Sequence, residues 1–202
     1  MDFSEFFDIL SFELKQTDDE NSSSQYEYLN KKGALFYVNE AMKELVEKNG
    51  TPFKKEENFT FNEETATWEL PEMYNSVSHY KYNGLWYAIS DTTDRFARVK
   101  TIGKRTLIFN PPIAKGGTIR LLAVKYPPVI YNDGDTVDFP DQFMRLLRLH
   151  IIMKAAGRKG KELSAYILAE YNEEMARWIT YGKPVKNTSF LHFKGYGFGR
   201  GR

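Results

Sequence analysis

The sequence predicts an α+β fold: a helical bundle, built from N-terminal helices and a C-terminal helical hairpin, with an inserted antiparallel β sub-domain and an extended C-terminal arm. Residues 1–50 and 139–182 repeat apolar side chains every three or four positions, as amphipathic helices do. Residues 51–138 instead alternate in short runs between turn residues, which is typical of strands. Residues 183–202 follow neither pattern. The predicted chain therefore has four parts.

The first part contains two predicted helices, over residues 2–15 and 24–49. Asn49-Gly50 and the following Pro52 indicate the end of the second helix. Gly33 costs roughly 1 kcal/mol relative to alanine inside a helix, so a kink or break is expected there if anywhere. The apolar faces consist of Phe3, Phe6, Phe7, Leu10 and Leu14 in the first helix and Tyr28, Leu35, Val38, Met42, Leu45 and Val46 in the second.

The second part, residues 51–138, predicts an antiparallel β sub-domain of six or seven strands. Its runs are rich in β-branched and aromatic residues and are separated by glycine, proline and asparagine. Asn83-Gly84 between two of these runs is a strong hairpin signal. The predicted strands cover residues 59–61, 65–70, 76–80, 85–89, 98–102, 106–109 and 118–126.

The third part, residues 139–182, predicts two helices joined by a short turn, which favours an antiparallel hairpin. Asp138 suits the cap of the first helix and Pro140 its first turn, and the glycines at 157–160 should end it. The second helix spans residues 161–180. Its apolar stripe consists of Leu163, Ile167, Tyr171 and Trp178.

The composition excludes several classes of protein. The 202 residues include no cysteine, so disulfides, thiolate metal sites and cysteine nucleophiles are ruled out. No run approaches the roughly 18 apolar residues of a membrane span, and the acidic start is unlike a signal peptide. We therefore expect a soluble protein, made and retained in the cytoplasm, that has no membrane partner.

Charge is distributed unevenly along the chain. Residues 1–72 carry 7 Lys/Arg against 17 Asp/Glu, whereas residues 139–202 carry 12 against 5. The oppositely charged ends could pair within one fold, form a basic nucleic-acid surface, or meet different partners, including other copies of the chain.

The histidines do not indicate a metal or catalytic site. His79, His150 and His192 fall on a predicted strand, a helix and the arm, without the spacing of metal ligands. Packing or surface roles are favoured for all three.

Other candidate motifs are also incomplete. Glu173 and Glu174 are adjacent on a helix and therefore point to different faces, unlike an acid/base pair. Asp133-Gly134-Asp135 lacks the rest of a calcium loop, and Gly116-Gly117 lacks the rest of a phosphate loop. We predict a protein that is not an enzyme and binds no metal or cofactor.

The arm, residues 183–202, contains bulky apolar side chains without a pattern that would bury them. Such side chains favour association when exposed to water, so we expect the arm to bind a partner, with packing on its own domain as the alternative. The proposed partner-binding residues are Phe190, Leu191, Phe193, Tyr196, Phe198, Arg200 and Arg202.

Two binding functions remain as alternatives. Residues 194–198 match the start of the RNP1 signature of RNA-recognition motifs, but the strand and helix needed to complete that fold do not follow. The basic C-terminal half and the Gly/Arg/aromatic tail still allow a nucleic-acid-binding module. Trp68, Trp86 and Tyr87 could stack on a sugar or small ligand, although we favour these three side chains as part of the β core.

Four short segments resemble head-to-tail adaptor proteins of tailed bacteriophages, of the connector or tail-tube-A type. The resemblance covers roughly residues 25–182. The segments are Trp68-Glu-Leu-Pro71, Leu107-Ile-Phe-Asn-Pro-Pro112 before a Gly-Gly turn, Val124-Lys-Tyr-Pro-Pro128, and Phe139-Pro-Asp-Gln-Phe143 at the start of the helix pair.

The resemblance implies a structural virion protein, assembled in the host cytoplasm. Such adaptors form a homo-oligomeric ring, commonly a dodecamer, between the portal protein and a tail or nozzle protein. DNA passes through the ring without specific binding, so we expect an acidic or mixed lining and place the basic helices of residues 139–181 mainly against partners. The β part and the extended termini would reach the portal or the tail.

Overall fold

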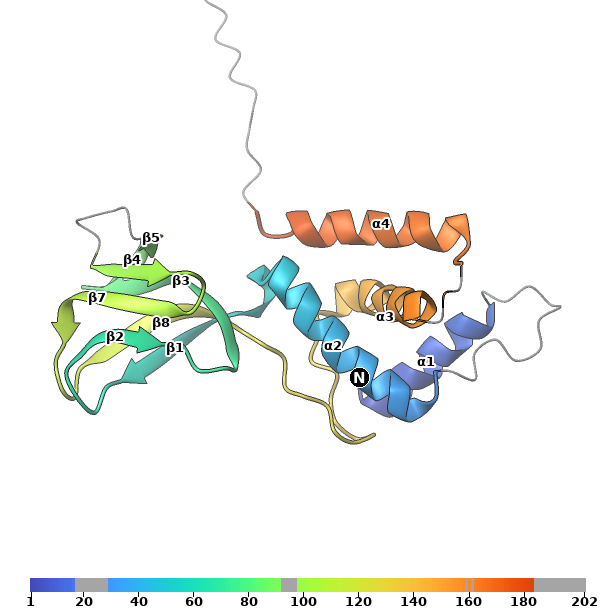
Figure 1. The fold of residues 1–202 in the computed structure, drawn as a ribbon, viewed down its shortest axis with the longest axis horizontal. Helices are drawn as coiled ribbons and strands as arrows, with labels where there is room; N and C mark the ends of the chain where they lie inside the picture. Colours follow the sequence, from blue (N-terminus) through green and yellow to red (C-terminus); the bar gives the residue numbers. More distant parts are fainter. Residues whose placement is uncertain (17–28, 92–97, 159, 161, 184–202) are drawn as a thin grey trace, which may run out of the picture.

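The computed structural model describes residues 1–16, 29–91, 98–158, 160 and 162–183. Helices lie at both ends of this part of the chain and strands lie between them (Figure 1). The α-helices are α1 (Phe3–Gln16), α2 (Lys31–Lys48), α3 (Met144–Arg158) and α4 (Ala165–Thr180), with short 3-10 helices η1 (Thr51–Phe53) and η2 (Asp141–Phe143). The strands are β1 (Lys54–Thr60), β2 (Thr65–Glu69), β3 (Tyr74–Tyr82), β4 (Leu85–Ala88), β5 (Ser90–Asp91), β6 (Val99–Ile102), β7 (Thr106–Ile113) and β8 (Thr118–Lys125).

The strands form two four-stranded sheets, in the orders β1-β8-β3-β4 and β2-β7-β6-β5. All pairs are antiparallel except β5 with β6, which is parallel. The sheets pack face to face around an apolar core to which both contribute, as in a β-sandwich. Its buried residues are Phe61, Tyr80, Val99, Leu107, Phe109, Ile119 and Leu121.

The helices enclose a second core beside the sandwich (Figure 1). Phe3, Phe6 and Leu10 of α1 are completely buried in it, as the predicted stripe requires. The start of the chain is fixed by backbone bonds: the Phe3 amide donates to the Asp135 carbonyl at 2.9 Å and the Val137 amide donates to the Met1 carbonyl at 3.0 Å. In α2, Asn30 caps the first turn through its side chain, which accepts a hydrogen bond from the Gly33 amide.

Helix α4 runs back over α3 and is anchored by Trp178. This side chain is completely buried, and its indole Nε1 donates to the Leu45 carbonyl at 2.9 Å. Phe139 stacks on the indole and Phe143 meets it edge-on, with ring centroids 5.2 and 4.8 Å away. Phe53 of η1 completes the cluster. One residue near the end of α4 thus contacts the end of α2, η1 and the start of the α3 region.

The predicted α+β class is right, but the predicted helical bundle with an inserted β sub-domain is wrong. The protein is rich in sheet, and the described strands form a two-sheet sandwich with its own core. Local sequence patterns did not reveal the full length of the strands, for a physical reason. The charged segment Lys54–Thr60 lacks strand character, yet it forms β1 because β8 supplies backbone partners along its whole length.

Several predicted boundaries also shift. Strand β7 continues through Pro111 and Pro112, where its register with β2 is interrupted between Thr65 and Thr67. Helix α2 begins at Lys31 rather than at residue 24, and α4 begins at Ala165, after the Ser164 cap, rather than at residue 161. Residues 24–28 and most of the arm lie outside the described residues.

We predict that Trp178→Ala lowers the free energy of unfolding by about 3–5 kcal/mol, because the substitution leaves a large cavity where three aromatic rings meet. Trp178→Phe should lower the free energy of unfolding by less, since phenylalanine keeps most of the packing. Its remaining effect comes from the lost hydrogen bond to Leu45. Urea denaturation of the full chain measures both. Tyr131→Ala is the control: its side chain is 73% exposed, and its loss should change stability by about 0.5 kcal/mol or less. Equal effects at the two positions would contradict the anchoring role of Trp178.

Candidate functional site

The partner-binding residues predicted from the sequence, Phe190, Leu191, Phe193, Tyr196, Phe198, Arg200 and Arg202, lie outside the described residues, as does His192. Their role therefore stays a prediction. The exposed apolar side chains of the described part include one group on the β-sandwich and one on α4.

The first surface is the tip of the β3–β4 hairpin. Asn83 and Gly84 both have positive φ, 47° and 81°, as the tight turn predicted from this dipeptide requires. Beyond the turn, every residue of β4 is exposed. Leu85, Trp86 and Tyr87 are 63%, 38% and 41% exposed, and Tyr82 faces Leu85 across the hairpin. We call Lys81, Tyr82, Leu85, Trp86 and Tyr87 the hairpin tip.

Two cations lie against the aromatic rings of the hairpin tip. Lys81 Nζ lies 5.5 Å from the centre of the Trp86 ring, and Arg98 Cζ lies 4.0 Å from the centre of the Tyr82 ring. Residues 74–90 contain no acidic residue, and neither cation forms an ion pair with any described residue. The hairpin tip is therefore both aromatic and basic.

A shallow cleft of about 230 Å³ lies between this hairpin and β7. Its lining includes Tyr80, Tyr82 and Arg98, together with Pro111 and Pro112 of β7. Tyr80 of β3 stacks on Tyr87, directly opposite it on β4, with ring centroids 5.5 Å apart, which holds the two strands of the hairpin together.

The second surface is the outward side of α4. Only Ile167 and Trp178 of this helix are buried. Leu168, Ala169, Ala176 and Ile179 are all exposed. Helical spacing places Ala169 and Ala176 opposite Trp178, and Leu168 and Ile179 together on one flank of the helix. Tyr166, 74% exposed, lies on the other flank. We call these five residues the α4 outer face. Figure 1 shows α4 at the edge of the helical part, with α3 on one side only.

The α4 outer face carries negative charge. Glu173 is exposed one turn after Ala169, and Glu162 is exposed just before the helix. Neither forms an ion pair with any described residue, whereas Arg177, the cation of this helix, pairs with Glu174. The hairpin tip is thus positively charged, whereas the surroundings of the α4 outer face are negatively charged.

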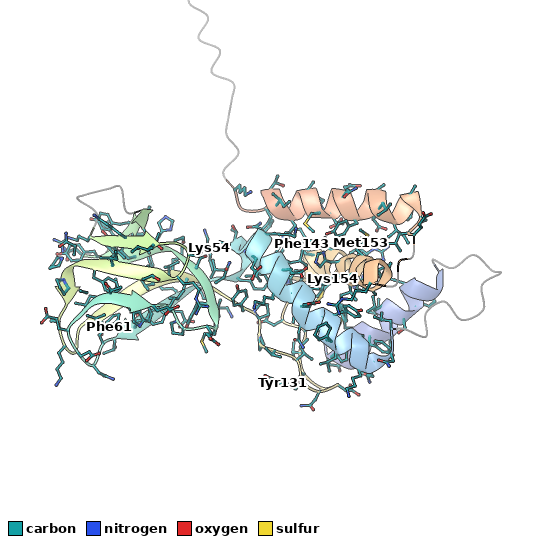
Figure 2. All side chains as sticks on the ribbon, in the orientation of Figure 1. Lys54, Phe61, Tyr131, Phe143, Met153 and Lys154 are labelled. Atoms are coloured by element: carbon teal, nitrogen blue, oxygen red, sulfur yellow. The ribbon has the colours of Figure 1, made fainter. Side chains whose placement is uncertain are left out.

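Beneath α4, a polar network joins three helices. The His150 side chain of α3 lies 2.9 Å from the Tyr171 hydroxyl of α4 through Nδ1, and 2.9 Å from a Glu44 carboxylate oxygen of α2 through Nε2. Lys154 pairs with the same carboxylate and, at 3.0 Å, with Glu40. Figure 2 shows Lys154 between these helices. Burial lowers the pKa of the His150 imidazole from its ordinary value near 6.5, and outweighs the opposite effect of Glu44.

A second ion-pair group holds α4 on α1 and α3. Arg145 donates to both oxygens of Glu170, at 2.8 and 2.9 Å, and pairs with Glu13 of α1 at 2.7 Å. These bonds to the inner side of α4 leave its outer face uncovered.

The other residues considered from the sequence have structural roles. Asp135 accepts hydrogen bonds from the Tyr131 and Asn132 amides, which lower the pKa of its carboxyl, and Asp133 pairs with Lys31. Trp68 packs against Phe59 and Phe61 inside the sandwich.

The expectation that Trp68, Trp86 and Tyr87 all belong to the β core is right for Trp68 and wrong for the other two. The alternation of β4 does not reveal this, because exposure there depends on where the facing sheet ends. Arg98 was also missed as part of a candidate site, since it lies far from the hairpin in the sequence. The Asn83-Gly84 turn was the one usable signal, because it places the neighbouring side chains at a protruding tip.

Within the described ranges, no group of three or more His, Asp or Glu side chains is arranged to hold a metal ion. None of the described helices combines the length and apolar character that a bilayer crossing requires. No known family model matches the chain, and a comparison with curated proteins finds no similar sequence.

We predict that stability falls as the pH is lowered from about 7.5 to 5.5, because the unfolded chain then binds a proton at His150 that the folded chain resists. Since the folded pKa lies below the unfolded value, the contribution is present above the unfolded pKa and is lost as the pH falls towards the folded one. Urea unfolding at several pH values measures it.

His150→Gln should flatten this pH dependence, whereas His79→Gln should keep it. His79 also lies in the folded region, where its Nδ1 meets the Ser78 hydroxyl. A His150→Gln variant with the slope of the unmodified protein would contradict the role assigned to the network.

Proposed function

We propose that this protein is a structural subunit of a homo-oligomeric ring, and that the ring is the head-to-tail adaptor of a tailed bacteriophage. The observation that carries the ring is the presence of two unlike exposed surfaces on one chain. The hairpin tip is aromatic and basic. The α4 outer face is apolar, and the nearby carboxylates of Glu162 and Glu173 have no basic partner among the described residues.

Unlike surfaces favour head-to-tail association. In a symmetric dimer the same patch contacts itself, whereas a heterologous interface joins two different patches and repeats until the rotation closes a ring. Exposed apolar side chains in two separate places also point to more than one contact per chain. Both features agree with an assembly subunit.

The phage assignment rests on the four sequence segments that resemble adaptor proteins. Under this proposal the ring, commonly a dodecamer in such proteins, lies between the portal protein and a tail or nozzle protein. DNA passes through it without specific binding. The chain performs no catalysis and needs no cofactor. The virion is its final location after assembly in the host cytoplasm.

The arm supplies a further contact in this proposal. Burying one phenylalanine side chain stabilises an interface by about 1.5–3 kcal/mol, and a ring repeats that contact at every subunit. Phe190, Phe193 and Phe198 would bind a neighbouring component, with Arg200 and Arg202 close by.

Nucleic-acid binding is the second candidate function. The observation that favours it is the hairpin tip, since exposed aromatic rings beside cations suit bases and phosphates. The basic charge of residues 139–202 adds to this.

We predict that the purified chain, alone or with its portal and tail neighbours, forms a closed ring in native mass spectrometry and electron microscopy. Deleting residues 186–202 should leave the fold intact, by circular dichroism and thermal unfolding, and abolish attachment of the ring to the tail component. Unchanged attachment would contradict the arm's role. A chain that stays monomeric with every neighbour would contradict the ring.

The two candidate functions also differ in solution. If the adaptor proposal is right, the chain should show little affinity for a single-stranded oligonucleotide in a fluorescence-anisotropy titration at low salt. Tight binding that weakens steeply between 50 and 200 mM salt, about 10³-fold or more for several phosphate contacts, would favour the nucleic-acid-binding module instead.

A further inference from the structure

We infer that the hairpin tip of one copy of this chain packs across the α4 outer face of the next copy. This interface rests on the proposed ring and specifies how its subunits contact one another. The occupant of each surface is therefore a second copy of the same chain.

The two surfaces are complementary in shape. The hairpin tip is a narrow two-stranded element that presents Trp86 and Lys81 on one face and Tyr82, Leu85 and Tyr87 on the other. On α4, Ala169 and Ala176 let another chain approach the helix closely, and Leu168 and Ile179 provide an apolar wall along one flank. Aromatic side chains that fill a shallow apolar surface are typical of the residues that dominate binding energy at interfaces.

The two surfaces are also complementary in charge. Lys81 and Arg98 have no acidic partner among the described residues, and Glu162 and Glu173 have no basic one. Charges left unpaired within one chain can pair between chains, where they guide association and fix the register.

The separate positions of the two surfaces in the fold favour a contact between two copies of the chain. Figure 1 shows the β3–β4 hairpin on the sandwich and α4 on the helical part, at separate places of the same molecule. Helix α4 is held in position by Trp178 and by Glu170 on its inner side. The two strands of the hairpin are held together by the Tyr80–Tyr87 stack.

The charge of the arm makes it an unfavourable partner for the hairpin tip. Residues 183–202 contain five Lys/Arg and no acidic residue, so the arm would meet like charge at Lys81 and Arg98. The α4 outer face, in contrast, is apolar and lies beside the carboxylates of Glu162 and Glu173.

Engineered cysteines test the contact directly, because the chain contains none of its own. Full-length Leu85→Cys and Ala169→Cys variants, carrying different tags, are mixed under mild oxidation. We expect a disulfide-linked dimer of the two tags. The control replaces Ala169→Cys with Tyr131→Cys, which is also exposed but lies in the loop after β8 (Figure 2), and should give no linked dimer.

Side-chain variants measure the energetics. Trp86→Ala should raise the concentration needed for ring formation roughly 30-fold, as expected for loss of a dominant interface residue. Lys81→Glu and Glu173→Lys should each raise it about fivefold, and the two together in one chain should restore association. Tyr131→Ala should leave it unchanged.

The outcomes separate this interface from the proposed function. Rings that form without the Leu85–Ala169 link, or that tolerate Trp86→Ala, would overturn the interface and leave the ring standing. A chain without oligomers under any condition would overturn both. Cross-linking of the hairpin tip to a cysteine in the arm, or protection of Trp86 fluorescence by an oligonucleotide alone, would assign the hairpin tip to a different partner and likewise overturn the interface.

Discussion

The burial of Trp178 is the interaction on which the helical half of this protein depends. Its indole fills the space between the end of α2, η1 and the residues that precede α3, and it donates to the Leu45 carbonyl. Because only one other residue of α4 is buried, this anchor and the ion pairs of Arg145 determine where the helix lies. Because so few residues of α4 are buried, its outward side remains exposed. The contacts that hold α4 in the fold thus also leave one side of the helix available for binding.

Strand pairing connects the two cores. Strand β1 follows directly on η1, and its first residue, Lys54, lies opposite Val124 near the end of β8. The chain therefore enters and leaves the sandwich at the same end, which brings α2 and the segment leading to α3 together. Val124 belongs to the helical core although it lies on a strand. The sandwich is in this way fixed to the helices by the ends of two paired strands as well as by the linkers.

The two exposed surfaces follow from how each half ends. The β3–β4 hairpin extends to a tip where every residue of β4 is exposed, and α4 has neighbours on one side only. Isolated exposed apolar residues are ordinary. Here, however, one surface combines aromatic rings with cations that have no acidic partner among the described residues, and the other combines apolar residues with carboxylates that have no basic partner there. The two surfaces therefore form a complementary pair. An assembly subunit accounts for both surfaces at once, whereas a ligand-binding module accounts for the hairpin alone.

The sequence by itself determined the α+β class, the hairpin at Asn83-Gly84 and the apolar stripes of α1 and α4, including Trp178 as an inward residue. These features depend on residues a few positions apart, where turn geometry and helical spacing act directly. Only the tertiary structure decided that the strands form two sheets, that the charged segment at Lys54 is a strand, and that Trp86 and Tyr87 face solvent. Those outcomes depend on contacts between residues far apart in the chain, such as Lys54 with Val124 and Tyr82 with Arg98, which no local pattern encodes.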